Sequence, residues 1–389
     1  MTTLRLLSAS GELSDATLND AGAYTRPTSP LRSRVAYAAA HVVPAVWGDN
    51  TPGRPADIDW DATLAFRRNM YSWGLGVADA MDTAQRNMGL DAAATRELIA
   101  RSAEVAREEG GSVVVGVNTD HVDETHISLD AVIDAYVSQL EFTEQQGAGP
   151  VLMASRHLAR VAESADDYRR VYRAVLDRAT TPVVLHWLGT AFDPELEGYF
   201  GASDWPTASE VLLDIINENP AKIAGVKMSL LDAESEISVR ERLPEGVRMF
   251  TGDDFNYVSL IGDAQVGTRS HSDALLGAFA AITPVASAAI QALDAGDDGE
   301  YRRILGPTEE LSRQIFAAPT FYYKTGVAFL SWLNGHQPAF HMVGGLHSAR
   351  SLPHLSRIVE LANASLALEN PELARERWHG MLTLNGFEL

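Results

Sequence analysis

The chain has 389 residues, of which 46% are hydrophobic, so it is long enough to bury one large core or two ordinary ones. It contains no cysteine, which excludes disulfides, thiolate metal sites and a catalytic cysteine and fits a reducing compartment. Acidic residues number 52 against 31 basic ones, and the formal charge of -21 argues against binding to nucleic acid or anionic lipid.

The first segment, residues 1–33, is polar and shows no sustained hydrophobic period, so we expect a lead-in there. From residue 34 onward, a short apolar run is repeatedly followed by a helical pattern and then by another apolar run. The apolar runs occupy residues 35–44, 75–81, 112–118, 150–155, 182–189, 222–229, 247–254 and 277–283. Uninterrupted apolar runs are typical of parallel strands that are buried on both faces.

Cap residues separate these runs at the expected places. An aspartate near residue 59 can begin a helix that ends at Gly74, and Asp91 can begin another that ends at Gly110. Such units, repeated over about 250 residues, predict a (β/α)8 barrel at residues 34–290 rather than a doubly wound sheet. From residue 291 the pattern is strongly helical, which predicts a C-terminal extension, residues 291–389, packed on the barrel.

Barrel enzymes carry their chemistry at the carboxyl ends of the strands, so the side chains there are the candidate site. Taken singly, most have ordinary explanations: a lysine that ends a strand is usually solvated, and paired aspartates often cap the next helix. The strand ends carry His41, Asp79, Asp82, Thr83, Asn118, Asp120, His121, Arg156, His157, His186, Lys227, Asp253, Asp254 and Thr283.

Lys227 follows an apolar strand and is a candidate for Schiff-base chemistry. The amine must be neutral to attack a carbonyl, and its ordinary pKa of about 10.4 falls when it is buried or lies near another cation. A neighbouring group must then transfer protons during dehydration of the carbinolamine. His186, on the preceding strand, is the candidate because a histidine pKa lies near neutrality.

Several segments resemble the dihydrodipicolinate synthase and N-acetylneuraminate lyase family of class I aldolase-like barrels. IAGVKMS at residues 223–229 is similar to the family's G-x-K strand six, and TGDD at 251–254 is similar to its S-G-D-D strand seven. GAFAAITPVAS at 277–287 resembles strand eight, and YYKTGVAFLSWLNG at 322–335 resembles the C-terminal helical segment. The order holds from about residue 33 to 368, and the chain is most similar to a divergent, uncharacterised branch.

The resemblance implies a lyase, aldolase or dehydratase that uses Lys227 as its Schiff-base lysine and needs no cofactor. His186 stands at the place of the family's strand-five tyrosine, which relays protons. The strand-two loop that holds a keto-acid carboxylate in the family reads M-D-T-A-Q at residues 81–85, which favours a sugar-derived keto compound over pyruvate. We expect the substrate to be bound by His41, Asp82, Thr83, Asn118, Asp120, Arg156, His157, Asp253 and Thr283.

Two other interpretations remain open at this point. The first is a divalent-metal-dependent sugar isomerase or epimerase on the same barrel, with imidazole and carboxylate ligands from separate strands. The second is a binding protein without turnover, because the strand-two and strand-five motifs are altered. The candidate metal ligands are His41, Asp79, Asp120, His121 and His186.

The remaining expectations concern location and assembly. The N-terminal residues lack the pattern of a secretory signal, and no run approaches about 18 apolar residues, so we expect a cytoplasmic protein. The resemblance implies a homodimer or homotetramer. A histidine-rich segment, residues 336–354, is expected to form an interface or cap, or to fold over the barrel mouth.

Overall fold

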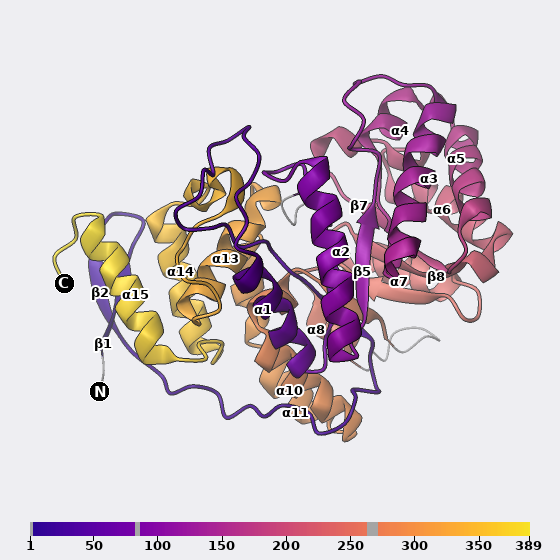
Figure 1. Ribbon diagram of the computed structural model, residues 1–389. Helices are drawn as coiled ribbons and strands as arrows, with labels where there is room; N and C mark the ends of the chain where they lie inside the picture. The colour runs from indigo at the N-terminus through magenta and orange to yellow at the C-terminus, as the bar shows by residue number, and fades with distance from the viewer. Residues whose placement is uncertain (1–2, 82–85, 263–270) are drawn as a thin grey trace.

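The computed structural model describes residues 3–81, 86–262 and 271–389. Its centre is a closed parallel barrel in which β10 lies between β9 and β3 and the other strands follow in chain order. The predicted (β/α)8 barrel is therefore confirmed (Figure 1). The barrel strands are β3 (Ala36–Ala39), β4 (Gly76–Asp79), β5 (Val113–Val117), β6 (Gly149–Leu152), β7 (Val183–Leu188), β8 (Ile223–Ser229), β9 (Arg248–Thr251) and β10 (Asp273–Leu276).

Helices surround the barrel and begin and end at the residues that the sequence indicates. The Asp59 side chain accepts a hydrogen bond from the Ala62 amide at the start of α1, and Asp91 caps α2 in the same way. Gly110 ends α2 in the left-handed conformation that favours glycine, at φ 64°. The helices of this part are α1 (Trp60–Ser72), α2 (Ala92–Glu109), α3 (Leu129–Gln146), α4 (Arg156–Val161), α5 (Ala165–Arg178), α6 (Trp205–Glu218), α7 (Ala233–Arg242), α8 (Tyr257–Ile261), α9 (Ala278–Ala281) and α10 (Thr283–Asp294).

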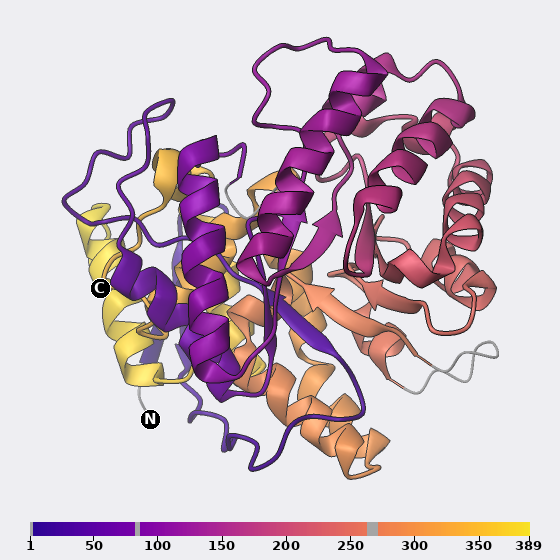
Figure 2. The ribbon, with the colours of Figure 1, turned by 45° about the vertical axis from the view of Figure 1, so that its right-hand side comes forward.

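The C-terminal part is helical, as expected, and packs against one side of the barrel (Figures 1 and 2). The expected boundary at residue 290 falls inside α10, which continues without interruption to Asp294. The helices that follow are α11 (Asp298–Leu305), α12 (Thr308–Ile315), α13 (Tyr323–Leu333), α14 (Leu352–Ala364) and α15 (Pro371–Leu384). Short 3-10 turns occur at η1 (Pro194–Leu196), η2 (Tyr199–Gly201), η3 (Pro220–Lys222), η4 (Thr320–Tyr322) and η5 (Val343–Ser348).

The N-terminal segment contains a hairpin that the sequence pattern did not indicate. Its antiparallel strands are β1 (Thr3–Leu7) and β2 (Leu13–Thr17). The hairpin lies against α14 and α15, so the two ends of the chain meet on one side of the molecule (Figures 1 and 2). Strand β2 is only partly buried, which explains why no hydrophobic alternation marks it.

The prediction of the last barrel strand was wrong by several residues. The run 277–283 was expected to be a strand, but it forms α9 and ends at the first residue of α10, and β10 precedes it. Thr283 is therefore the first residue of α10, where its hydroxyl donates to the carbonyl of Phe279 at 2.9 Å. The apolar run alone could not distinguish the strand from a buried helix.

Strand pairing brings the candidate catalytic residues together. His186 on β7 is paired in register with Lys227 on β8, and Lys227 is paired with Phe250 on β9. Phe250 belongs to one apolar cluster with Val151 and Leu275 from other strands, so it faces the barrel interior. Paired residues of parallel neighbours point to the same face, so Lys227 and His186 face the interior as well. No helix in the described ranges is long and apolar enough to cross a membrane.

Candidate active site

Lys227 is buried inside the barrel, with 9% of the residue exposed. The glycine of the TGDD motif, Gly252, makes room for it. A side chain at that position would approach Lys227 Cε to 2.9 Å and the Ser229 hydroxyl to 2.2 Å. Glycine is therefore required beside the lysine for a steric reason, which links the strand-six and strand-seven motifs to one another.

His186 lies next to Lys227 and is fully buried. Its Nε2 is 3.1 Å from the Ser229 hydroxyl, and its Nδ1 has no hydrogen-bond partner among the described residues. Burial, together with the positive charge of Lys227, holds the pKa of His186 well below its usual value. The imidazole is neutral, so the expectation that it titrates near neutrality is corrected. It can still accept or donate a hydrogen bond.

Asp253 was predicted to bind substrate and Asp254 was given no specific role, and the structure places the two aspartates differently. The Asp253 carboxylate accepts hydrogen bonds from the Phe255 and Asn256 amides at 2.9 and 3.1 Å, so it caps the following turn. Asp254 lies at the barrel mouth and accepts from the Ala278 amide at 2.8 Å. Burial raises the pKa of Asp254 to about 7, although the charge of nearby Lys227 opposes the shift.

Lys324 was not selected from the sequence, yet it reaches the same region from α13. Its Nζ donates a hydrogen bond to the Ala39 carbonyl at the end of β3. Burial lowers the pKa of Lys324 to about 7, and the charge of Asp254 opposes this shift. The available signal was its place in YYKTGVAFLSWLNG, where it is the single charged residue of an apolar helix.

His41 follows β3 and is fully buried. Its Nε2 lies 2.6 Å from the Gln337 side-chain oxygen, and its Nδ1 has no partner in the described part of the chain. Burial lowers the pKa of His41 to about 3, so the ring is neutral. Gln337 belongs to the histidine-rich segment, 336–354, which in this way reaches the strand ends of the barrel.

A cavity of about 520 Å³ opens over the carboxyl ends of β5 and β6. Its lining includes four predicted substrate-binding residues, Asn118, Asp120, Arg156 and His157, but neither Lys227 nor His186. The predicted site is therefore divided into an inner cluster around Lys227 and an outer cavity. Asp82 and Thr83 lie outside the described residues.

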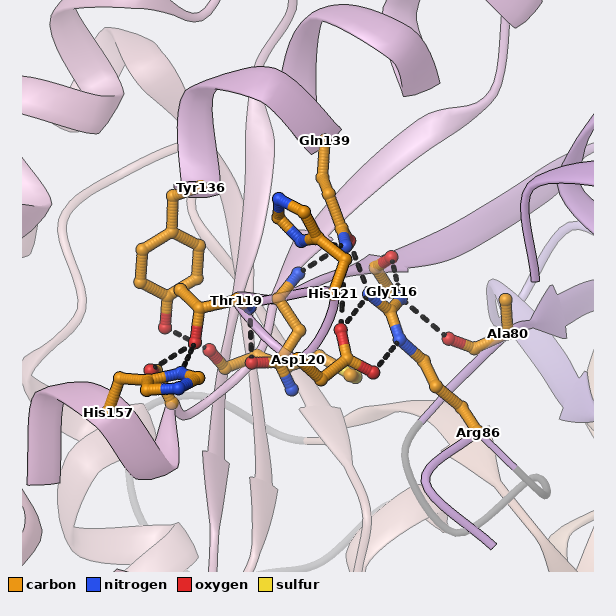
Figure 3. A network of polar contacts seen from close by, with 12 residues as sticks. Ala80, Arg86, Gly116, Thr119, Asp120, His121, Tyr136, Gln139 and His157 are labelled. Atoms are coloured by element: carbon orange, nitrogen blue, oxygen red, sulfur yellow. Dashed lines mark hydrogen bonds and ion pairs between the residues drawn. The ribbon is translucent and has the colours of Figure 1, made fainter. Parts of the chain in front are cut away.

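A buried arginine orders one wall of the cavity (Figure 3). Arg86 binds Asp120 through two hydrogen bonds, Nε to Oδ2 at 2.7 Å and Nη2 to Oδ1 at 2.6 Å. It also donates to the Gly116 carbonyl at 2.6 Å, while Gln139 bridges Asp120 and His121. Although burial acts in the opposite direction, the charge of Arg86 keeps the pKa of Asp120 below its usual value.

The opposite wall of the cavity is fixed through His157 (Figure 3). Its Nε2 donates to the Glu124 carbonyl at 2.9 Å, so its Nδ1 is the nitrogen that accepts from the Thr119 hydroxyl at 2.8 Å. The neighbouring Arg156 forms an ion pair with Asp193 at 2.7 Å. Both walls combine charged groups with fixed hydrogen-bond geometry, which suits a polar ligand.

The candidate metal ligands do not converge. Asp79 accepts two hydrogen bonds from Arg67, each 2.9 Å long, and one from the Ser102 hydroxyl at 2.5 Å, so its side chain points toward the helices. Asp120 is held by Arg86. Within residues 3–81, 86–262 and 271–389, no three histidine or carboxylate side chains come together as a metal site. The five-residue ligand set is therefore corrected.

Comparison with known protein families shows to which family the chain belongs. The sequence profile of a family described as "Protein of unknown function (DUF993)" matches residues 4–387. The chain belongs to this family. No protein of curated function matches the sequence of this DUF993 member.

Solved structures of the dihydrodipicolinate synthase family share the fold of this DUF993 chain. The Escherichia coli K12 prophage protein YagE, of the dihydrodipicolinic acid synthase family and in complex with pyruvate, is 14% identical with a TM-score of 0.65, covering 86% of this chain and 99% of that one. Dihydrodipicolinate synthase from Aquifex aeolicus is 13% identical (TM-score 0.64, covering 87% and 100%). The synthase from Bacteroides thetaiotaomicron is 15% identical (TM-score 0.62, covering 84% and 98%). The resemblance noted in the sequence is confirmed at the level of the fold.

Proposed function

We propose that the protein is a Schiff-base-forming lyase, aldolase or dehydratase that acts on a small carbonyl compound. The observation that carries the proposal is the buried amine of Lys227 inside the barrel, beside a neutral imidazole and a carboxyl group that titrates near neutrality. Such an arrangement combines a nucleophile with groups that can move protons. The fold shared with the dihydrodipicolinate synthase family supports the same class of chemistry.

The proposed reaction begins when the lone pair of Lys227 Nζ attacks the substrate carbonyl and forms a carbinolamine. Asp254, in its protonated form, donates a proton to the carbinolamine hydroxyl, which leaves as water and gives the iminium ion. The iminium then accepts the electron pair of the bond that breaks next to it. His186 Nδ1 holds a substrate hydroxyl by a hydrogen bond, because that nitrogen has no partner in the described structure.

The outer cavity would hold the remainder of the substrate. Its mixture of arginine, carboxylate and amide groups suits a polyhydroxylated or charged compound, which agrees with a sugar-derived keto compound or a 2-oxo acid. The chemistry needs no cofactor. With the resemblance as support, we also propose a cytoplasmic homodimer or homotetramer.

Borohydride trapping tests the proposal directly. The folded protein is incubated with 2-oxo acids and keto sugars, reduced, and analysed by intact and peptide mass spectrometry. We expect a mass increase that maps to Lys227 and is absent from Lys227→Ala. Lys222→Ala is the matched control, because Lys222 donates to a backbone carbonyl outside the barrel mouth, and it should retain the adduct. Folded protein that forms no adduct with any compound would contradict the proposal.

A further inference from the structure

Lys324 brings a second buried amine to the barrel mouth from outside the barrel. Its helix α13 belongs to the C-terminal part, and only 2% of the residue is exposed. The Nζ atom donates a hydrogen bond to the Ala39 carbonyl. A lysine ammonium has three N–H donors, so two of them have no acceptor within the residues that the structure describes.

The charge of Lys324 also lacks a direct partner. Over the described ranges no carboxylate oxygen lies within ion-pair distance of its Nζ, although Asp254 and Asp79 act on it from farther away. Arg67 and Lys227 add positive charge to the same region. Burying a cation without a paired anion is costly, and a bound anion would offset that cost.

Two imidazole nitrogens beside these lysines have unused hydrogen-bonding capacity. They are Nδ1 of His41 and Nδ1 of His186, both fully buried and without a partner among the described residues. Lys324 acts electrostatically on His41, and Lys227 does so on His186. Buried polar groups are usually satisfied, so unsatisfied ones next to two amines indicate a place for a polar ligand.

We propose that Lys324 binds an anionic group of the substrate while Lys227 attacks its carbonyl. The substrate class is then a carbonyl compound with a carboxylate within a few bonds of the reacting carbon, such as a 2-oxo acid. The inference rests on the proposed Schiff-base function, because that function assigns the carbonyl to Lys227. It places anion recognition near the end of β3 rather than in the strand-two loop, where the sequence offers Asp82.

The test compares trapping by charged and neutral probes. Pyruvate and 2-oxobutyrate are reduced onto the protein with borohydride alongside their neutral amides. Each adduct forms with loss of water, followed by hydride transfer to the imine carbon. In the wild type, we expect half-maximal labelling of Lys227 at a concentration about ten-fold lower for the acids than for the amides. Lys324→Met should remove this preference by weakening the acids alone, whereas the control Lys222→Met should keep it.

The stability of the variant separates a binding role from a structural one. Lys324→Met removes a buried charge at similar volume, so the ligand-free variant should unfold at the same or a higher temperature than the wild type. A lower unfolding temperature, an equal effect on acids and amides, or an adduct on Lys324 itself would overturn the inference.

A further comparison keeps this inference distinct from the proposed function. In Lys227→Ala, which cannot form the imine, the two 2-oxo acids should still raise the unfolding temperature more than their amides do. The additional Lys324→Met substitution should abolish that difference. If the wild type forms no adduct but Lys227→Ala still discriminates acids from amides, only the Schiff-base function fails. If Lys227→Ala shows no discrimination, the anion subsite fails.

Discussion

Burial gives individual side chains at the barrel mouth properties that they do not have in water. Asp254 and Lys324 carry opposite charges in solution, yet burial brings the pKa of each to about 7. His41 and His186 are kept neutral by the same effect. A carboxyl group and an amine that both exchange protons near neutral pH suit proton transfer around a Schiff base.

The raised pKa of Asp254 predicts how the stability of the protein depends on pH. Burial raises its pKa from the ordinary value of 3.8 to about 7, so between these values the folded protein keeps a proton that the unfolded chain releases. The wild type therefore loses stability relative to Asp254→Asn as the pH rises from 4 to 7, by on the order of 3 kcal/mol. The difference levels off above about pH 8, where the carboxyl group is ionised in both states. Urea unfolding of both proteins at pH 5, 6, 7 and 8 measures it. A difference that does not change with pH would contradict the assignment.

At the residue scale, the sequence predicted that His186 and Lys227 lie on neighbouring strands, but it did not predict how the side chains beyond the strand ends are oriented. Lys227 and His186 follow from the strand pattern and from the resemblance. Choosing between Asp253 and Asp254 requires knowing where β9 ends and which way the chain turns, and a run of apolar residues does not define that point. Lys324 could not be assigned to the mouth, because its position depends on how α13 packs across the barrel more than 280 residues from Ala39 in sequence.

At the scale of single elements, a buried ion pair joins α1 to β4. Arg67 and Asp79 are both fully buried and form two hydrogen bonds of 2.9 Å, and Arg67 also donates to the His41 carbonyl at 2.7 Å. The pair thereby fixes the helix against the strand ends that carry the site. The sequence marked Asp79 as a strand-end group but not its direction, because neighbouring strand residues point to opposite faces.

Removing one partner of this pair should be strongly destabilising. Asp79→Ala leaves the Arg67 charge buried and unpaired, so we expect a loss of about 3–5 kcal/mol in the free energy of unfolding. The double variant Arg67→Met with Asp79→Ala should recover part of that loss. As a control, Glu108→Ala removes an exposed partner of Arg68 on the same helix and should cost less than about 1 kcal/mol. Unfolding in denaturant measures these free energies. If Asp79→Ala and Glu108→Ala lose the same stability, burial of the Arg67–Asp79 pair does not explain the effect.

The elements themselves were predicted to different degrees. Strands flanked by clear caps, such as β4 and β8, were placed correctly because the apolar run and the turn residues agree. The last strand was misplaced because small and apolar residues continue from β10 through α9, with the single residue Gly277 between the two elements. The hairpin of β1 and β2 was missed because its stability comes from contacts with helices at the other end of the chain.

On the scale of the whole molecule, the two ends of the chain together support the helix that carries Lys324. Hairpin strand β1 lies against α14, and its Leu7 amide donates to the Ser356 hydroxyl at 2.7 Å. Trp378 on α15 donates its indole N–H to the Arg5 carbonyl at 2.7 Å. The indole ring also packs edge to face against Phe329 of α13, with 6.0 Å between the ring centroids. Contacts far from the barrel therefore hold α13, and with it the amine at the mouth.

Trp378→Ala should test this connection. The indole is fully buried, so its removal should cost about 3–5 kcal/mol of unfolding free energy. Because α13 loses support, the preference of Lys227 labelling for 2-oxo acids over their amides should weaken at temperatures where the barrel is still folded. Trp47→Ala is the matched control, since Trp47 is 87% exposed and should change neither quantity. If Trp378→Ala lowers stability but leaves the preference intact, Lys324 is held by the barrel mouth alone, through its bond to the Ala39 carbonyl.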